Sequence, residues 1–435
     1  MPTMRCKAIV TLVLCFFIFV ANTQAQSSLS EGQAFEQDGM TAYRAGDFLG
    51  AITGFELALE NRPGHSRLVI YLASVHAELG NADAAMHYLE IYAQMGLSRA
   101  LNKEDFPQNI DAERFADVAA KMVANNTPLA AAELAFATKA PVALSEGIAF
   151  DPESGDYFIS SIYDQKIMRV TGAGKLSVFT EGLVANPMAL AFDEKRGLLW
   201  VATTILPQTR AQYFAERQKQ TGVMAFARDG ERVHHFNLFP DFFEGEEQNI
   251  SLGDVFVAGN GDVFLSNSSG QDVFRLRYGE KLKVDSFTIE NSASLQGMTM
   301  LGGTLFVMDY STGLHSLNVE TGASQWLTIP DGVTLLGIDG LYAHDGKLIA
   351  VQNGIRPSRV IEISLADDHN SVAGVEVLEQ AHAYFSEPTN GVIVGDEFYF
   401  IANSGWAEFG NIENITSEML ENLAPTKIMK INLAD

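Results

Sequence analysis

The segments Glu146-Gly-Ile-Ala-Phe and Asp339-Gly-Leu-Tyr-Ala are two copies of a short pattern, an opening residue followed by an apolar run, that recurs along the chain. The other four copies are Met188-Ala-Leu-Ala-Phe, Gly253-Asp-Val-Phe-Val, Gln296-Gly-Met-Thr-Met and Asn390-Gly-Val-Ile-Val. The first residues of successive copies lie 42, 65, 43, 43 and 51 positions apart. Short strands repeating about every 40–50 residues are typical of a β-propeller. The sequence therefore predicts six blades, each with one copy at the start of its inner strand.

The opening residues predict a polar site on the propeller axis, because the inner strand of each blade runs beside the central channel. Glu146 and Asp339 would bring carboxylates to this site, and Gln296 and Asn390 would bring amides. Oxygen donors of these kinds are what a hard cation such as calcium requires. Gly253 supplies no side chain, and strand alternation points its neighbour Asp254 away from the axis.

The last blade is one strand short at its C-terminal end. Its third predicted strand, Lys427-Ile-Met-Lys-Ile, lies close to the end of the chain. The segment from Ala132 to Thr138, just ahead of the first blade, has the apolar composition of a strand. We expect it to supply the missing strand, which closes the ring and removes two exposed sheet edges.

Two insertions lengthen the predicted blades, at Thr203–Thr221 and at Asn403–Thr426. They contain the large aromatic residues Tyr213, Phe214, Trp406 and Phe409. Insertions of this kind are either surface segments with a local core or lids over a ligand site, and the sequence leaves both interpretations open.

A helical module precedes the propeller. Residues 32–65 and 66–97 each show a helix, a tight turn at Gly46-Asp47 or Gly80-Asn81, and a second helix with small residues at packing positions. This pattern resembles the tetratricopeptide repeat, which implies a docking surface for a protein or peptide partner. We expect the module to span residues 26–127 and the propeller residues 128–435.

Residues 1–25 are predicted to be a secretory signal, with Arg5 and Lys7 ahead of an apolar run and small residues before a cleavage site at Ala25. The alternative is a membrane anchor, for which a run of about 14 apolar residues is short. Cys6 and Cys15 both fall in this segment, so the mature chain has no disulfide. We therefore expect a periplasmic or secreted bacterial protein without a stable membrane span after cleavage.

The net charge of −25 becomes −27 without residues 1–25, which carry two positive and no negative side chains. This acidic excess argues against nucleic-acid binding, because phosphates require lysine and arginine. The sequence has no Gly-x-Ser-x-Gly elbow, Walker loop, dinucleotide fingerprint, His-Glu-x-x-His or EF-hand loop. The histidines are scattered, so we interpret them as structural or surface residues.

Residues 143–433 resemble the gluconolactonase/regucalcin (senescence marker protein) family of six-bladed propellers. Glu146-Gly147 matches the first-blade motif of that family, and Asp339-Gly340-Leu341 matches the fifth. Gln296-Gly297-Met298 stands where the family has Asn-Gly-Leu, and Gly253-Asp254-Val255 stands where it has Asn-Asp-Gly or Asn-Asp-Val.

The resemblance implies a divalent cation, usually calcium, that polarises the carbonyl group of a lactone or ester substrate. Carried over by position, Glu146, Gln296 and Asp339 are metal ligands, and Asp339 is also the catalytic base. Further axial or substrate-binding positions are Asp254, Asn390 and Asn353.

Three functions remain open at this stage. A metal-dependent hydrolase of lactones or esters is favoured by the carboxylate pair Glu146 and Asp339. A non-catalytic propeller and repeat protein that binds its partners in an exported complex is favoured by the missing ligand at Gly253. A dehydrogenase propeller that binds a sugar or a cofactor is the weaker third alternative, because the sequence shows no quinone-binding pattern.

Overall fold

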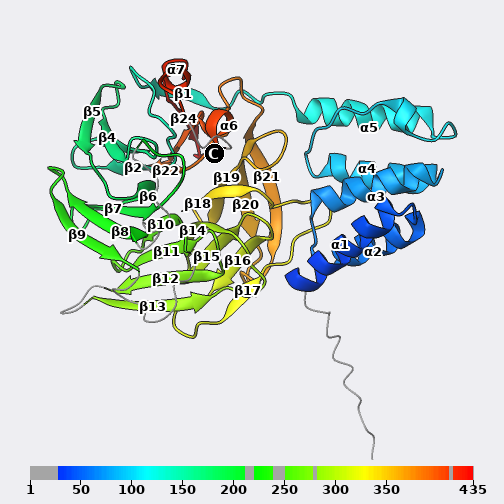
Figure 1. Cartoon of the computed structure of the whole chain (residues 1–435), viewed down its shortest axis with the longest axis horizontal. Coiled ribbons are helices and arrows are strands. Elements are labelled where there is room, and N and C mark those ends of the chain that lie inside the picture. The colour runs from blue at the N-terminus through cyan, green and yellow to red at the C-terminus, as the bar shows by residue number, and fades with distance from the viewer. Residues whose placement is uncertain (1–27, 211–219, 239–249, 278–281, 411–414, 435) are drawn as a thin grey trace, which may run out of the picture.

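The computed structural model describes residues 28–210, 220–238, 250–277, 282–410 and 415–434. Within these ranges, strands form six four-stranded antiparallel sheets arranged as the blades of a propeller, with helices at one side (Figure 1). The predicted fold, a six-bladed β-propeller preceded by a helical module, is confirmed. The predicted signal segment 1–25 lies outside the described residues.

The strands follow the chain blade by blade, from the inner strand outward. Blade one contains β2 (Ile148–Asp151), β3 (Asp156–Ser161), β4 (Lys166–Val170) and β5 (Leu176–Thr180). Blade two contains β6 (Asn186–Asp193), β7 (Leu198–Thr204), β8 (Gly222–Ala227) and β9 (Arg232–Asn237). Blade three contains β10 (Leu252–Val257), β11 (Val263–Asn267), β12 (Asp272–Arg277) and β13 (Lys283–Thr288).

The second half of the ring repeats this order. Blade four contains β14 (Leu295–Leu301), β15 (Thr304–Asp309), β16 (Gly313–Leu317) and β17 (Ser324–Trp326). Blade five contains β18 (Ile338–His344), β19 (Lys347–Gln352), β20 (Arg359–Leu365) and β21 (Val372–Gln380). Blade six contains β22 (Gly391–Val394), β23 (Glu397–Ile401), β24 (Lys427–Asn432) and, as its outer strand, β1 (Glu133–Ala137).

The strand β1 closes the ring as the sequence predicts. It pairs antiparallel with β24, and Phe136 is buried against the cores of blades one and six. Beyond the strand, the backbone amide of Thr138 donates to the carbonyl of Thr426 at 2.9 Å, and the amide of Thr426 donates to the Thr138 hydroxyl at 3.0 Å. The two ends of the propeller are therefore joined within one sheet.

The blades pack through apolar side chains, and their inner strands approach closely where glycine follows the opening residue. A Cβ atom on Gly297 would lie 2.6 Å from the carbonyl oxygen of Asp339 in the next blade. On Gly147 it would lie 2.9 Å from the backbone nitrogen of Leu190. The glycines in the repeated pattern thus permit backbone contact around the channel.

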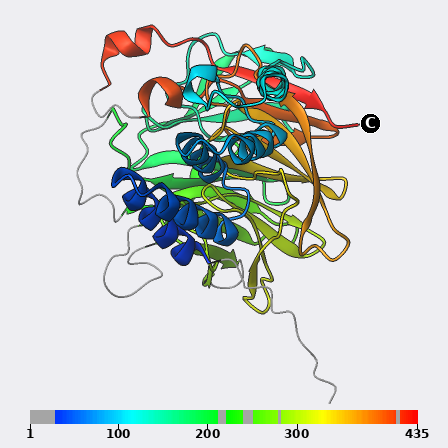
Figure 2. The same ribbon diagram turned by 90° about the vertical axis from the view of Figure 1, so that its right-hand side faces the viewer.

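The helical module contains α1 (Leu29–Arg44), α2 (Phe48–Asn61), α3 (Ser66–Glu78), α4 (Ala82–Gln94), a short 3-10 helix η1 (Lys103–Asp105) and α5 (Ala112–Asn125). Gly46 and Gly80 occupy the turns within the pairs α1–α2 and α3–α4 with φ angles of 77° and 76°. The helices lie against one face of the propeller (Figures 1 and 2). None of the helices in the described ranges is long and apolar enough to cross a membrane.

Candidate active site at the propeller mouth

Two carboxyl groups meet at the face of the propeller where the inner strands begin. Glu146 lies just ahead of β2 in blade one, and Asp339 is the second residue of β18 in blade five. Their side chains form a hydrogen bond with each other, and Glu146 is only 6% exposed. These predicted site residues therefore come together although 193 positions, 146 to 339, separate them in the chain.

Glu146 is held by a residue of the blade-six insertion. The indole Nε1–H of Trp406, at the start of α6 (Trp406–Phe409), donates a hydrogen bond to Glu146 Oε2. The backbone beside Glu146 is also held, because the amide of Gly147 donates a hydrogen bond to Ser160 Oγ at 2.8 Å. Trp406 thus orients one carboxyl of the pair from a distant part of the sequence.

The blade-six insertion also has a core of its own. Phe409 packs with Leu144 and Tyr163, and the insertion continues into α7 (Ser417–Glu421). The insertion therefore forms a local core, and through Trp406 it also contacts Glu146. Tyr213 and Phe214 of the other insertion lie outside the described residues.

Asp339 is held by a short chain of hydrogen bonds. Asn353 Nδ2 donates to Asp339 Oδ2 at 2.9 Å and to the carbonyl of Pro388 at 2.9 Å. The Tyr310 hydroxyl donates to Asn353 Oδ1 at 2.9 Å. The carboxylate of Asp339 and the carbonyl of Pro388 are both acceptors, so the nitrogen of the Asn353 amide must face them. Asn353 is thereby a donor that positions Asp339.

Burial and mutual repulsion shape the charge of the carboxyl pair. Burial raises the pKa of Glu146 well above its usual value, and the nearby charge of Asp339 raises it further. Burial likewise raises the pKa of Asp339 to about 6, although the hydrogen bond from Asn353 opposes this shift. Both carboxyl groups therefore hold a proton more tightly than ordinary carboxyl groups, and they titrate as a coupled pair.

Gln296 and Gly253 are linked in space. A Cβ atom added to Gly253 would lie 2.8 Å from Gln296 Oε1 and 2.9 Å from the carbonyl oxygen of Leu295. Gln296 Nε2 donates to Ser294 Oγ at 3.3 Å, which directs the amide oxygen away from Ser294. The longer side chain in blade four therefore fills the space that the missing side chain in blade three leaves.

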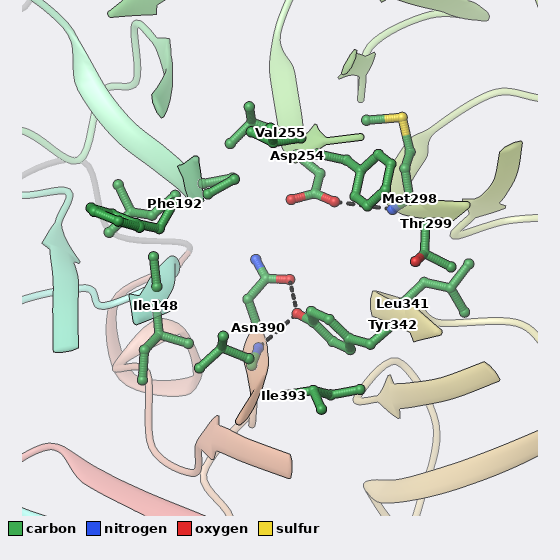
Figure 3. A pocket seen from close by; sticks show the side chains of 18 of the residues that line it. Ile148, Phe192, Asp254, Val255, Met298, Thr299, Leu341, Tyr342, Asn390 and Ile393 are labelled. Atoms are coloured by element: carbon green, nitrogen blue, oxygen red, sulfur yellow. Dashed lines mark hydrogen bonds between the residues drawn. The ribbon is translucent and has the colours of Figure 1, made fainter. Parts of the chain in front are cut away.

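Asp254 corrects one expectation from the sequence. Its side chain points into the channel rather than away from it, together with Tyr342 and Asn390 (Figure 3). The reason is a shift in the pairing of β10 with β11 between Leu252 and Val255, which interrupts strict alternation. Similar shifts occur near the openings of β6, β14 and β18.

These residues form a second polar group, deeper in the channel. Asp254 Oδ2 accepts from the amide of Met298 at 3.0 Å, and the Tyr342 hydroxyl contacts Asn390 Oδ1 at 3.2 Å (Figure 3). Burial raises the pKa of Asp254 to about 7. A cavity of about 240 Å³ opens beside them. The opening residues therefore do not all meet at one point, because Asn390 belongs to this deeper group.

The mouth of the propeller opens into a larger cavity of about 720 Å³. Tyr310, Asn353 and Glu387 line its propeller side, and residues of α3 and α4 line the other side. Asn353 contacts both this cavity and Asp339, so the cavity lies next to the carboxyl pair. Sequence reasoning missed Tyr310 and Glu387 because neither belongs to the repeated pattern.

The channel mouth brings together the carboxyl groups of Glu146 and Asp339, and the amide nitrogen of Asn353 faces Asp339. In the described part of the chain, no group of three or more His, Cys, Asp or Glu residues is placed to hold a metal ion. Buried His315 lies apart from the pair in blade four, where it contacts Thr312 Oγ1 at 2.8 Å. Carboxylate oxygens are ligands that a hard cation takes, so Glu146 and Asp339 could contribute two of them.

No family model matches the chain, and no curated protein matches it. Among solved structures, it is similar to a gluconolactonase from Xanthomonas campestris, with 14% identity over 67% of this chain and 87% of that one and a TM-score of 0.45. A putative gluconolactonase shows 18% identity over 69% and 91%, with a TM-score of 0.47. Gluconolactonases are the family that the sequence resembles.

Propellers with other chemistry are equally similar. An aldose sugar dehydrogenase from Streptomyces coelicolor, bound to PQQ, shows 10% identity over 70% of this chain and 98% of that one, with a TM-score of 0.47. Virginiamycin B lyase from Staphylococcus aureus shows 13% identity over 71% and 99%, with a TM-score of 0.45. These similarities do not distinguish one activity from another, so the function must be argued from the site.

Proposed function

We propose that this protein is an exported, divalent-metal-dependent hydrolase of lactones or related esters. The observation that carries the proposal is the hydrogen-bonded pair of Glu146 and Asp339 beside a cavity at the propeller mouth. Two carboxyl groups in such surroundings repel each other when both are ionised. A cation between them removes that repulsion, and substrate in the cavity would then lie next to it.

Glu146 and Asp339 would hold the cation, and Gln296 is the proposed third oxygen donor. Calcium fits this set best, because it accepts carboxylate, amide and water oxygens in flexible geometry. When bound, such a cation polarises the acyl carbonyl of the substrate. We propose export because residues 1–25 have the composition of a secretory signal.

Asp339 is the proposed base. Hydrolysis adds water across the acyl C–O bond, so one proton must leave the water as its oxygen joins the acyl carbon, and the departing oxygen must gain one. Asp339 lies next to the cavity, where its carboxylate would take the proton of the attacking water and pass it to the departing oxygen. Asn353 keeps Asp339 oriented, and the Tyr310 hydroxyl fixes Asn353 in turn.

The test is a panel of γ- and δ-lactones and aryl esters. The protein is stripped with a chelator and resupplied with calcium, magnesium, manganese or zinc. We expect turnover that is lost on stripping, restored by calcium, and reduced at least about a hundredfold in Glu146→Gln and Asp339→Asn. Asp345→Asn is the matched control, because Asp345 is exposed in the turn just after the same strand β18. Turnover that ignores both the chelator and the two variants would refute the proposal.

A non-catalytic binding protein is the second candidate. It is favoured by Gly253, which supplies no ligand from blade three. This candidate predicts that the stripped and resupplied protein binds lactones or their hydroxy-acid products without any turnover. Calorimetry on the same panel separates the two functions, since bound ligand recovered unchanged after prolonged incubation identifies the second one.

A further inference from the structure

The helical module is fastened to the propeller face that carries the carboxyl pair. The amide of Ser98 donates to the carbonyl of Arg356 at 2.9 Å, and buried Arg359 donates from Nη1 to the carbonyl of Met95 at 3.0 Å. Val69, Met95 and Leu97 form an apolar cluster with Ile355. The module therefore has a defined position over this face (Figure 2).

The large cavity lies between the module and the propeller. From the helical side it is lined by Arg67 and Tyr71 of α3, by Tyr92 of α4, and by Arg99 just beyond α4. From the propeller side it is lined by Tyr310, Asn353, Arg356 and Glu387. The helices thus form the roof of the cavity, and the polar groups around Asp339 form part of its floor.

The charge of this cavity is opposite to that of the molecule. The chain has 54 acidic and 29 basic residues, yet the lining contains Arg67, Arg99 and Arg356 against a single acidic residue, Glu387. Arg356 on the floor is close enough to Glu387 to lower its pKa, against the larger effect of burial. Within the described part of the chain, Arg67 and Arg99 form no ion pair. The roof therefore presents two positive groups to whatever occupies the cavity.

The start of α3 adds to this positive character. The first turn of α3 begins at Ser66, which lines the cavity, and no side chain caps it. The amide groups of an uncapped first turn carry partial positive charge. An adjoining cavity of about 270 Å³ shares Arg67 and Tyr310, and is also lined by His65, whose Nδ1 is buried without a hydrogen-bond partner in the described residues.

We propose that the helical module is the roof of the substrate-binding cavity and that Arg67 and Arg99 bind an anionic group of the substrate. This inference rests on the proposed function: the substrate is a lactone or ester that also carries a carboxylate or a phosphate. Tyr71 and Tyr92 form aromatic walls with hydroxyl groups for hydrogen bonding. The anionic end lies against the roof, and the acyl end reaches Asp339 past Asn353.

The experiment uses the full chain, with Arg67→Gln, Arg99→Gln and the double variant. Arg44→Gln is the control, because Arg44 is exposed in the last turn of α1 and is absent from the cavity lining. Each variant is assayed on a γ-lactone and on the same ring bearing a carboxylate. Charge-assisted hydrogen bonds of this kind predict a loss of about 10–100-fold in kcat/KM for the anionic lactone per arginine, mainly through KM. Turnover of the neutral lactone should change less than about threefold.

The outcomes separate this inference from the proposed function. Equal losses on both lactones, or no loss on the anionic one, overturn the anion-binding roof while leaving the hydrolase intact. A second readout is binding of inorganic phosphate and acetate by calorimetry. Binding that Arg67→Gln and Arg99→Gln abolish supports the roof even in a protein that hydrolyses no lactone, whereas binding that the variants leave unchanged overturns it.

Discussion

Replacing Asp339 with asparagine should stabilise the metal-free protein while removing its activity. Burial raises the pKa of Asp339 from 3.8 to about 6 in the folded state. A shift of about 2 units corresponds to a cost of about 3 kcal/mol for ionising this carboxyl group in the fold. Because the folded state holds this proton more tightly, the contribution of Asp339 to stability is greatest below about pH 4 and falls as the pH rises through about 6. Asparagine keeps the shape and can accept the same hydrogen bond from Asn353, without the charge.

The expected result is a pH-dependent difference between the two proteins. In chelator, denaturant unfolding should give Asp339→Asn the same free energy of unfolding as the parent at pH 4, and up to about 3 kcal/mol more at pH 8. With calcium at pH 8 the parent should become the more stable protein, because it binds the ion with one carboxylate more than Asp339→Asn does. Turnover should fall at least about a hundredfold in the variant. Parallel stability curves for the two proteins, with turnover retained, would refute the reasoning.

Three further substitutions test other parts of the structure. Trp406→Phe removes the N–H that lowers the pKa of Glu146. With a higher pKa less of the carboxyl group is ionised, so calcium binding at pH 7 should weaken by about tenfold and recover at higher pH. A calcium affinity that is unchanged across this pH range would count against the contact. Gly253→Asn should cost about 1–3 kcal/mol of stability, because its Cβ would meet Gln296 and the backbone carbonyl of Leu295. Adding Gln296→Gly removes only the first of these contacts, so it should recover part of the loss in denaturant unfolding; additive losses would show that the two positions are independent. Phe136→Ala should lower the free energy of unfolding by about 3–5 kcal/mol, because Phe136 anchors β1 in the core between blades one and six. Leu134→Ala, on the exposed side of β1, should lower it by less than about 1 kcal/mol. Similar losses in the two variants would contradict closure of the ring through β1.

The fold was predictable because its signal is periodic. Copies of one strand pattern mark every blade, and the shortage of one strand at the C-terminus identifies the segment around Phe136 as the closing strand. The carboxyl pair was predictable for the same reason, since Glu146 and Asp339 occupy equivalent positions in two blades. Periodicity relates equivalent positions in different blades even when many residues lie between them.

The rest of the site has no periodic signal. Asp254 turns into the channel because the pairing register shifts at the start of β10, and alternation along the sequence does not reveal such a shift. Trp406 reaches Glu146 across 260 residues from an insertion that interrupts the repeat. Arg67 and Arg99 reach the mouth only because the helical module packs on one face of the propeller, a packing that no local pattern encodes.

The most direct test of the central claim is calorimetric titration of calcium into the metal-free protein near pH 6.5, in two buffers that differ in protonation enthalpy. Burial raises the pKa values of both carboxyl groups, and ligands must be deprotonated to bind a cation. We predict one site per chain, with release of about one proton per calcium ion in the parent and no comparable site in Glu146→Gln. Absence of binding, or binding of the same strength and proton count in Glu146→Gln, would contradict the claim that Glu146 and Asp339 form a metal centre.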